Sequence, residues 1–413
     1  MDDLHIAHAG HWETGQPIHI AVRNGVIREV SDRPLHGQTR ETVDAKGFVV
    51  SPAFVEPHYH LDKVLITEGS RPGATFEQQI EAVALSKRNY TAENVALRAE
   101  SVARLMVMRG VSCIRTFADV DSFVGLTALR GLLLLRDRLR DLIDLQIVAF
   151  PQHGLFADPG SIDRLREAMA LGANLLGGHP QLEVSEADGH RQIAWLFDMA
   201  REYDCDLDFH VDENDAPGSR WLDAVVTATL EHGWHGRVNV AHCASLIKRP
   251  AEEREYLCER IQRAGVTIVS SPTSGLLFRG HGDVDPTRGI VPVRELLDRG
   301  IRVACAQEVY RSVFAPNLRL PDPVFTAQIM AYSAKLSDEL GLQEVWRMVT
   351  TSPARALGID RYGLEVGCRA NFVLLQGRSA SDVLTTLAPA RKVYREGRLI
   401  ARSSFVEQIC GEL

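Results

Sequence analysis

The chain has 413 residues, of which 45% are hydrophobic and 24% are charged, and its formal net charge is -8 at pH 7. This acidic balance argues against binding to nucleic acid or to an anionic membrane, and it favours a small neutral substrate. The first residues lack the basic and apolar regions of a signal peptide, and no segment has the roughly 18 uninterrupted apolar residues that a membrane helix needs. We therefore predict a soluble, cytoplasmic protein with one large domain and one smaller domain.

Seven cysteines are scattered along the chain, and none belongs to a Cys-x-x-Cys pair. An odd and dispersed set of cysteines is typical of reduced thiols in a cytosolic protein, and it argues against both a disulfide framework and a thiolate zinc site.

The two ends of the chain resemble each other and differ from the middle. Short segments rich in β-branched residues occupy 19–22, 26–30 and 41–45 near the start, and 370–375, 391–395 and 398–401 near the end. Turn signals such as Asn24-Gly25 and Glu396-Gly397 separate them. Each end alone has too few strands for independent stability, so we predict that residues 1–53 and 360–413 join in one small β-sandwich domain.

Between the ends, strand-like apolar runs alternate with helical patterns, which is typical of repeated βα units. The runs occupy residues 48–60, 111–117, 145–152, 173–179, 207–213, 238–243, 266–272 and 303–308. Helical patterns lie between most of them, for example at 92–109, 161–171 and 190–203. Eight such units predict a (β/α)8 barrel over residues 54–359. Run seven and residues 273–300, which look more like a loop than a helix, fit this pattern least well.

Barrel enzymes carry their chemistry at the carboxyl ends of the strands, and most of the predicted strands end in a polar side chain. These side chains are His58 and His60 on strand one, Gln152 on strand three, His179 on strand four, His210 and Glu213 on strand five, His242 on strand six, and Glu308 on strand eight. Any one of them could be an ordinary strand-end group. Residues two apart on a strand point to the same side, however, so His58 and His60 can converge on one cation, and the barrel brings strands five and six to the same mouth. The set predicts a metal site.

At this point the sequence resembles a known family. The Pro-His-x-His-Leu-Asp motif at 57–62, Phe150-Pro151-Gln152 ahead of Gly154, His210-x-Asp212-Glu213, Ala241-His242 and the closing Gly367-x-x-Ala370-Asn371 are similar to those of the amidohydrolase superfamily. Within that superfamily, the chain most resembles the cytosine deaminase group and its relative that removes isopropylamine from a triazine ring. As a set these motifs are specific, whereas His-x-His alone is weak.

The resemblance implies a role for each of these residues. His58, His60 and His210 would bind one divalent metal ion, Fe2+ or Zn2+, and His242 would either join them or contact the water on the metal. Glu213 would move a proton to a ring nitrogen of the substrate, and Gln152 would bind its amide-like edge. The substrate would be a small nitrogen heterocycle that loses ammonia or an amine. The resemblance also leaves homo-oligomer formation open.

The chain departs from the family pattern around strand eight. Counting without gaps places Glu308 where the family has an aspartate that contacts the metal and shuttles a proton, and Gln307 where a histidine usually stands. A misplacement of about 1 Å can cost roughly a hundredfold in rate, so the longer side chain requires an adjusted pocket. Phe117 replaces a histidine of close relatives and makes that side of the pocket more apolar. Phe314 stands where cytosine deaminase has a tryptophan beside its ring.

Several residues keep two interpretations. His179 lines the pocket or is a loop histidine bonded to backbone, and Lys63 and His153 touch substrate or are solvated. Asp212 orients a metal ligand or caps the segment that follows.

Two functions from different classes are also open. One is a metal-dependent hydrolase of heterocyclic amines, and the other is a non-catalytic descendant of the fold that binds metal or ligand without turnover because Glu308 replaces the aspartate.

Overall fold

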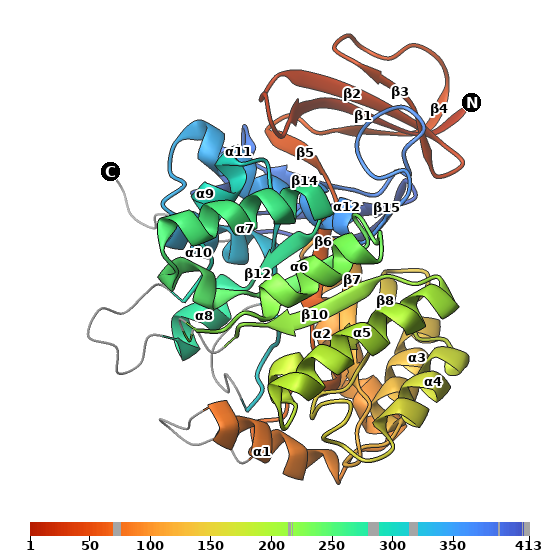
Figure 1. The fold of residues 1–413 in the computed structure, drawn as a ribbon. Helices are drawn as coiled ribbons and strands as arrows, with labels where there is room; N and C mark the ends of the chain where they lie inside the picture. The colour runs from red at the N-terminus through yellow and green to blue at the C-terminus, as the bar shows by residue number, and fades with distance from the viewer. Residues whose placement is uncertain are drawn as a thin grey trace.

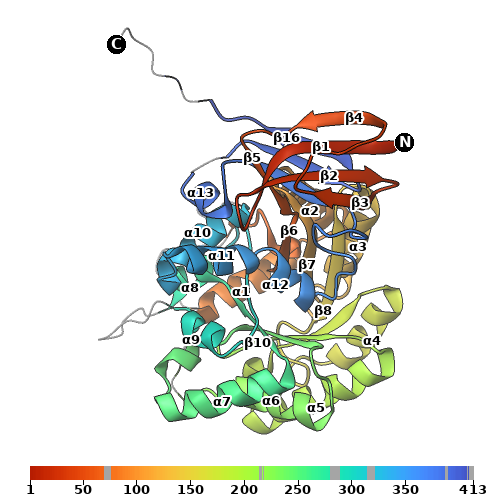
Figure 2. The same cartoon turned by 90° about the horizontal axis from the view of Figure 1, so that it is seen from above.

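The computed structural model describes residues 1–68, 76–213, 216, 218–279, 289–313, 321–386, 389–406 and 408. The described residues form two sheets, each of eight strands. One sheet is the barrel, and the other is built by the two ends of the chain and lies beside it (Figures 1 and 2). Among the described residues, no helix is both long and apolar enough to cross a lipid bilayer.

The barrel sheet consists of eight parallel strands that follow one another in chain order. They are β6 (Phe54–Tyr59), β7 (Val111–Asp119), β8 (Asp144–Phe150), β9 (Leu175–Gly178), β10 (Leu207–Val211), β11 (Val238–His242), β12 (Thr267–Ser270) and β13 (Val303–Cys305). Each overlaps one of the eight predicted runs, so the predicted (β/α)8 barrel is confirmed. The runs were recognisable because strands of a parallel sheet are buried on both faces and read as continuous apolar segments.

Helices connect the barrel strands and cover their outer face (Figure 1). They are α1 (Phe76–Lys87), α2 (Ala92–Met108), α3 (Thr127–Leu139), α4 (Ser161–Leu171), α5 (Glu186–Tyr203), α6 (Trp221–Glu231), α7 (Ala251–Ala264), α8 (Pro272–Phe278), α9 (Val293–Asp298), α10 (Pro323–Ala334), α11 (Glu339–Arg347) and α12 (Thr351–Ala356). Short 3-10 turns follow β6 (Leu61–Lys63), β9 (Pro180–Leu182) and β11 (Ala244–Lys248). The expectation of a loop over 273–300 is wrong in part, because α8 and α9 both lie there; both are too short to show a helical period in the sequence.

The first predicted run, 48–60, is not one strand. The chain leaves the terminal sheet after β5 (Phe48–Pro52) and enters the barrel with β6, and Ala53 lies between the two. Residues of β5 pair antiparallel with β14, whereas Phe54 at the start of β6 pairs with Val111 of β7. Both halves are buried, so hydrophobicity alone does not reveal that they belong to different sheets.

The barrel closes between β13 and β6 without a regular ladder. Tyr59 forms an isolated parallel bridge with Glu308, and the backbone N–H of His60 donates to the Glu308 carbonyl at 2.8 Å. The buried carboxylate of Glu56 also accepts from the backbone N–H groups of His58 and Gln307, at 3.3 Å each. This seam places the two histidines of β6 beside the segment that carries Glu308.

The terminal sheet has the order β16-β15-β14-β5-β1-β2-β3, and β4 pairs with β1. Its further strands are β1 (Asp2–His11), β2 (Pro17–Arg23), β3 (Val26–Ser31), β4 (Thr39–Asp44), β14 (Phe372–Gln376), β15 (Arg391–Arg395) and β16 (Arg398–Ser403), and the helix α13 (Ala380–Leu384) lies between β14 and β15. As predicted, both ends of the chain contribute to it. A bulge between Ile6 and Ala9, where His8 has a φ of 58°, bends β1 so that it pairs with β4 at one end and β5 at the other.

The two sheets share packed side chains. The buried Trp346 of α11 packs edge-to-face on Phe54 of β6, with ring centroids 5.3 Å apart, and its indole N–H donates to the Ser51 hydroxyl at 2.9 Å.

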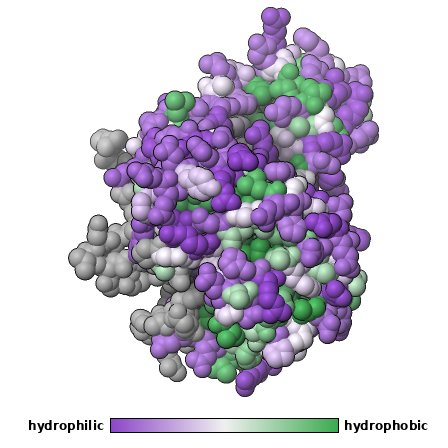
Figure 3. All heavy atoms as spheres, in the orientation of Figure 1, coloured by the Kyte–Doolittle hydropathy of each residue, from purple (hydrophilic) through white to green (hydrophobic). Residues whose placement is uncertain are grey.

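Six cysteines lie among the described residues and all are free thiols, five of them buried. Hydrophilic side chains cover most of the face in Figure 3, with small apolar areas between them.

Candidate active site

Four histidines from three strands meet at the carboxyl end of the barrel. His58 lies near the end of β6 and His60 directly follows that strand, while His210 comes from β10 and His242 from β11. The ring centroids of His58 and His210 lie 4.5 Å apart, and the Nε2 atoms of His60 and His210 lie 3.2 Å apart. Ligand atoms of His58, His210 and His242 all lie within 4.8 Å of one another. The structure therefore brings the predicted histidines together.

This cluster fits a metal ion. Burial lowers the pKa of His58 to about 3 and holds the pKa values of His60 and His210 well below 6.5, so the rings are neutral and able to ligate. Both ring nitrogens of His58 and Nδ1 of His210 lack a hydrogen-bond partner among the described residues, although both side chains are buried. Unpartnered buried nitrogens are costly, and a bound cation would satisfy them.

Two carboxylates face the histidines. Glu308 follows β13, and its backbone has a positive φ of 83°, which is strained for a residue with a side chain. Carboxylate oxygens of Glu308 and Glu213 and a nitrogen of His242 lie within 4.8 Å of one another. The hydroxyl of Ser274, on α8, donates to Glu308. Burial, with a smaller contribution from Glu308, raises the pKa of Glu213 to about 8, so this group can carry a proton at neutral pH.

The structure describes one of the two residues predicted to bind substrate, Gln152, and does not describe the other. Gln152 is buried just after β8, and its amide nitrogen lies 3.4 Å from Nδ1 of His179. His179 is 1% exposed, and its Nε2 lies 3.7 Å from a Glu213 oxygen. The structure therefore places His179 beside Glu213 and in hydrogen-bond contact with the backbone of Gln152. Phe314 lies outside the described residues.

One wall of the site is aromatic. The Phe117 ring, on β7, has its centroid 4.4 Å from that of His58 and 4.7 Å from that of His210. Phe150, at the end of β8, lies 4.4 Å from His210 and 5.2 Å from Phe117. Phe117 thus packs directly on the metal-ligand candidates and excludes water from that side.

A buried cluster of charges borders the site, and the sequence analysis missed most of it. Lys63 Nζ lies 3.1 Å from Nδ1 of His60 and donates to Asp119 at 2.5 Å. Asp119 also binds Lys87 of α1, which donates to Asp121 at 2.6 Å. Lys63 is 2% exposed, so its solvated interpretation is wrong. Asp119 was detectable as an inward-facing neighbour of Phe117 two residues along β7, whereas α1 carries no motif that would place Lys87 in the site.

Asp212 has the capping role. Its carboxylate accepts from the Ser219 hydroxyl at 2.5 Å and from the backbone N–H groups of Trp221 and Leu222 at 3.0 and 3.2 Å, at the start of α6. The buried Arg249 donates to it as well. Asp212 therefore fixes the turn between His210 and α6.

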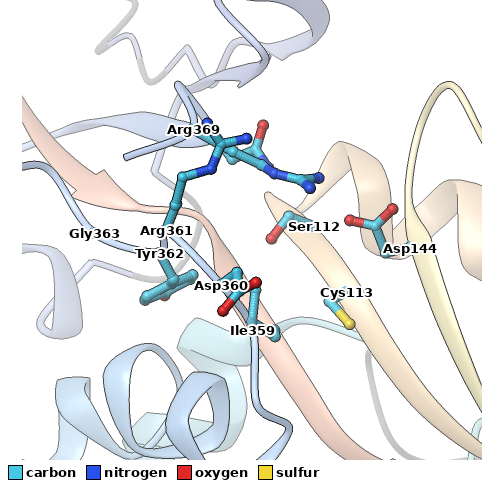
Figure 4. Close-up of a pocket in the computed structure, with 10 residues that line it drawn as sticks. Ser112, Cys113, Asp144, Ile359, Asp360, Arg361, Tyr362, Gly363 and Arg369 are labelled. Atoms are coloured by element: carbon cyan, nitrogen blue, oxygen red, sulfur yellow. The ribbon is translucent and has the colours of Figure 1, made fainter. Parts of the chain in front are cut away.

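One cavity of the molecule lies away from the histidines. Residues at the amino-terminal ends of β7 and β8 and in the segment before β14 line it, including Ser112, Asp144 and Arg369 (Figure 4). Barrel chemistry is concentrated at the opposite, carboxyl end of the strands, so the four histidines mark the candidate site.

Comparison with known proteins assigns the family. Residues 124–401 match the amidohydrolase family. The chain is 31% identical over 381 residues to N-isopropylammelide isopropyl amidohydrolase of Pseudomonas sp. (strain ADP), covering 90% of this chain and 91% of that one. It is 29% identical to pterin deaminase of Rhizobium rhizogenes, over 93% and 88% of the two chains. The structure of 5-methylcytosine deaminase from Klebsiella pneumoniae liganded with phosphonocytosine superposes with a TM-score of 0.93 at 28% identity, covering 98% of this chain and 100% of that one. This chain belongs to the amidohydrolase family, whose deaminases and related hydrolases act on carbon–nitrogen bonds.

Proposed function

We propose that this chain is a metal-dependent hydrolase that removes ammonia or an amine from a small nitrogen heterocycle, such as a cytosine-like pyrimidine or a triazine. The carrying observation is the convergence of four buried histidines beside a carboxyl group that holds a proton at neutral pH. Two of them, His58 and His210, have ring nitrogens without a hydrogen-bond partner among the described residues. The relatives named for isopropylammelide, pterin and 5-methylcytosine support this substrate class.

His58, His60, His210 and Glu308 would hold one divalent ion, Fe2+ or Zn2+, through imidazole nitrogens and a carboxylate oxygen. When bound, such an ion lowers the pKa of a coordinated water from 15.7 to about 7 and so makes a nucleophile available at neutral pH.

The remaining chemistry belongs to the chain itself. Glu213 donates its proton to a ring nitrogen as the oxygen of water bonds to the adjacent carbon, and Glu308 accepts the proton that water gives up. Glu308 then passes that proton to the exocyclic nitrogen, whose bond to the carbon breaks to release ammonia or the amine, while the proton of the new hydroxyl returns to Glu213 and leaves a carbonyl. His242, whose Nε2 lies 3.6 Å from Glu213, faces the same space. Phe117 and Phe150 keep bulk water away, which strengthens each of these polar interactions.

A second candidate function is the binding of metal or ligand without turnover. It is favoured by the departure of Glu308 and Gln307 from the family pattern at strand eight. The contact between Glu308 and Ser274 supports the hydrolase, since it holds the longer carboxylate beside Glu213 and His242.

The test is elemental analysis of protein purified without chelator or affinity metal, followed by assays for released ammonia and amine with cytosine, 5-methylcytosine, N-isopropylammelide and pterin. We expect about one equivalent of iron or zinc per chain and turnover of at least one compound. Bound metal without turnover of any compound supports the second candidate, and the absence of metal after reconstitution contradicts both. The proposal includes a cytoplasmic location. Size-exclusion chromatography of the same sample tests whether the chain forms a homo-oligomer.

A further inference from the structure

Phe117, on β7, lies in the middle of the histidine cluster, and its side chain is fully buried. Its ring centroid lies 4.4 Å from that of His58, 4.7 Å from that of His210 and 5.1 Å from that of His60. One apolar side chain therefore packs against all three histidines that we propose as metal ligands.

The rings of His58 and His210 lack the hydrogen bonds that usually orient a histidine ligand. Such a ligand binds the metal through one nitrogen and, in most metal sites, donates from the other to a carboxylate or a carbonyl, which fixes the ring. Among the described residues, neither nitrogen of His58 has a hydrogen-bond partner, and Nδ1 of His210 has none. Nε2 of His210 faces His60 at 3.2 Å. Within the described part of the chain, packing is therefore what orients these two rings.

An imidazole needs such support because the last torsion of the histidine side chain is broad and has no narrow rotamer well. The planes of Phe117 and His58 are tilted by 50°, and those of Phe117 and His210 meet at 82°. Phe150 meets Phe117 at 77° with ring centroids 5.2 Å apart, so the Phe117 ring is itself held in place. A flat and fixed ring between the two histidines opposes the rotation of both.

We propose that Phe117 is a positioning residue of the metal centre, whose rigid ring holds His58 and His210 in the orientation that binds the ion. It acts in place of the hydrogen-bond acceptors found in most metal sites. Rings that are ordered before the ion binds lose no further freedom, and each such ring contributes up to about tenfold in affinity. The inference rests on the proposed function, because it takes the metal ligands from there.

The alternative is that Phe117 only fills the interior of the barrel. Methionine separates the two roles, because it fills an apolar space but is flexible and has no flat face. If Phe117 only fills space, Phe117→Met keeps the affinity of the wild-type protein for metal. If the ring positions the histidines, Phe117→Met loses affinity although the space stays filled.

The experiment compares the full chain with Phe117→Leu, Phe117→Met and two matched controls, Phe372→Leu and Phe372→Met. Phe372 lies in β14 of the terminal sheet, is as fully buried as Phe117, and stacks on Tyr394 with ring centroids 4.8 Å apart. Competition with a chelator measures the affinity for Zn2+. The visible absorption of the cobalt-substituted protein reports the geometry of the ligands, and urea denaturation of the metal-free protein reports stability.

We expect both Phe117 variants to bind Zn2+ about 10 to 100 times more weakly than the wild-type protein and to shift the cobalt spectrum. Both Phe372 variants should keep the wild-type affinity and spectrum, although their urea midpoints also fall. An unchanged affinity or an unchanged cobalt spectrum in Phe117→Met overturns the inference. An equal loss of affinity in the Phe372 variants overturns it as well, because affinity would then only follow stability.

The failure of the proposed function has a different signature. Wild-type protein that binds metal but turns over no compound contradicts the hydrolase, while the affinities of the Phe117 variants still decide the role of this ring. Wild-type protein that binds no metal contradicts both. If Phe117→Leu does not fold, Phe117→Met, which leaves a smaller gap, decides alone.

Discussion

Two layers of side chains inside the same barrel differ in how completely their polar atoms are hydrogen-bonded. In the lower layer, toward the amino ends of the strands, Arg115 of β7 donates to Asp208 of β10 at 3.0 Å and to Gln146 at 3.0 Å. Gln146 donates in turn to the backbone carbonyl of Leu357 at 2.8 Å, and Asn239 donates to that of Ala356 at 3.3 Å. Each of these four side chains has at least one protein partner, and Oδ1 of Asp208 is the atom among them that lacks a hydrogen bond within the described part of the chain.

The upper layer stands two residues further along the same strands. Phe117 follows Arg115 on β7, and His210 follows Asp208 on β10, so each pair points to the same interior. Here His58 and His210 have ring nitrogens that lack a hydrogen-bond partner within the described part of the chain, and His242, Cys243 and Glu308 adopt positive φ angles. A buried polar group with a partner specifies the fold, whereas one without a partner costs stability and points to a ligand.

The largest expected effect comes from removing a ligand of the upper layer. His210→Ala should reduce bound metal to near zero and turnover by several orders of magnitude, because the nucleophile depends on the cation. Elemental analysis and the ammonia assay measure both. His190→Ala, at an exposed position on α5, is the matched control and should change neither. Unchanged metal content in His210→Ala would contradict the ligand assignment.

In the lower layer the expected effect is on stability. Asp208→Leu leaves the guanidinium of Arg115, which is 1% exposed, without its carboxylate and should reduce the free energy of unfolding by about 3 to 5 kcal/mol. Urea denaturation of the metal-free protein measures this loss. Asp208→Asn keeps the shape and an acceptor and should lose clearly less. If the two variants lost the same amount, the ion pair would not be the cause.

Glu308→Asp tests the departure from the family pattern. Shortening the side chain by one methylene withdraws the carboxylate from Ser274 and shifts its position by about 1 Å, so we expect turnover to fall by roughly a hundredfold. Steady-state kinetics on the best substrate of the panel measure the change, and Ser274→Ala, which removes the hydroxyl from the same contact, should produce a smaller loss. A gain in cytosine turnover would instead show that the site is a family site impaired at this one position.

Much of the fold could be read from the sequence because parallel strands are continuous apolar runs with polar side chains at their ends. His58, His210 and Glu213 were found in this way. The sequence could not show that β5 and β6 belong to different sheets, because hydrogen-bond partners leave no trace in hydrophobicity. Nor could it place Lys87, since nothing in α1 distinguishes a lysine that reaches two buried carboxylates from a solvated one. Contacts between distant segments decide both cases.

The smallest expected effect is a gain in the stability of the metal-free protein. In metal-free protein the imidazole of His58 is buried, and neither of its nitrogens has a hydrogen-bond partner among the residues that the structure describes, so the chain bears the cost of removing them from water. His58→Leu replaces the ring with an apolar side chain against Phe117 and should raise the free energy of unfolding of the metal-free protein by about 1 kcal/mol while preventing metal binding. Urea denaturation in the presence of chelator measures the change, and the same variant in excess metal should be less stable than wild-type protein, because only the wild type gains binding energy. A loss of stability in chelator would mean that His58 contributes packing that leucine cannot replace, and the contrast between the two layers would then rest on His210 alone.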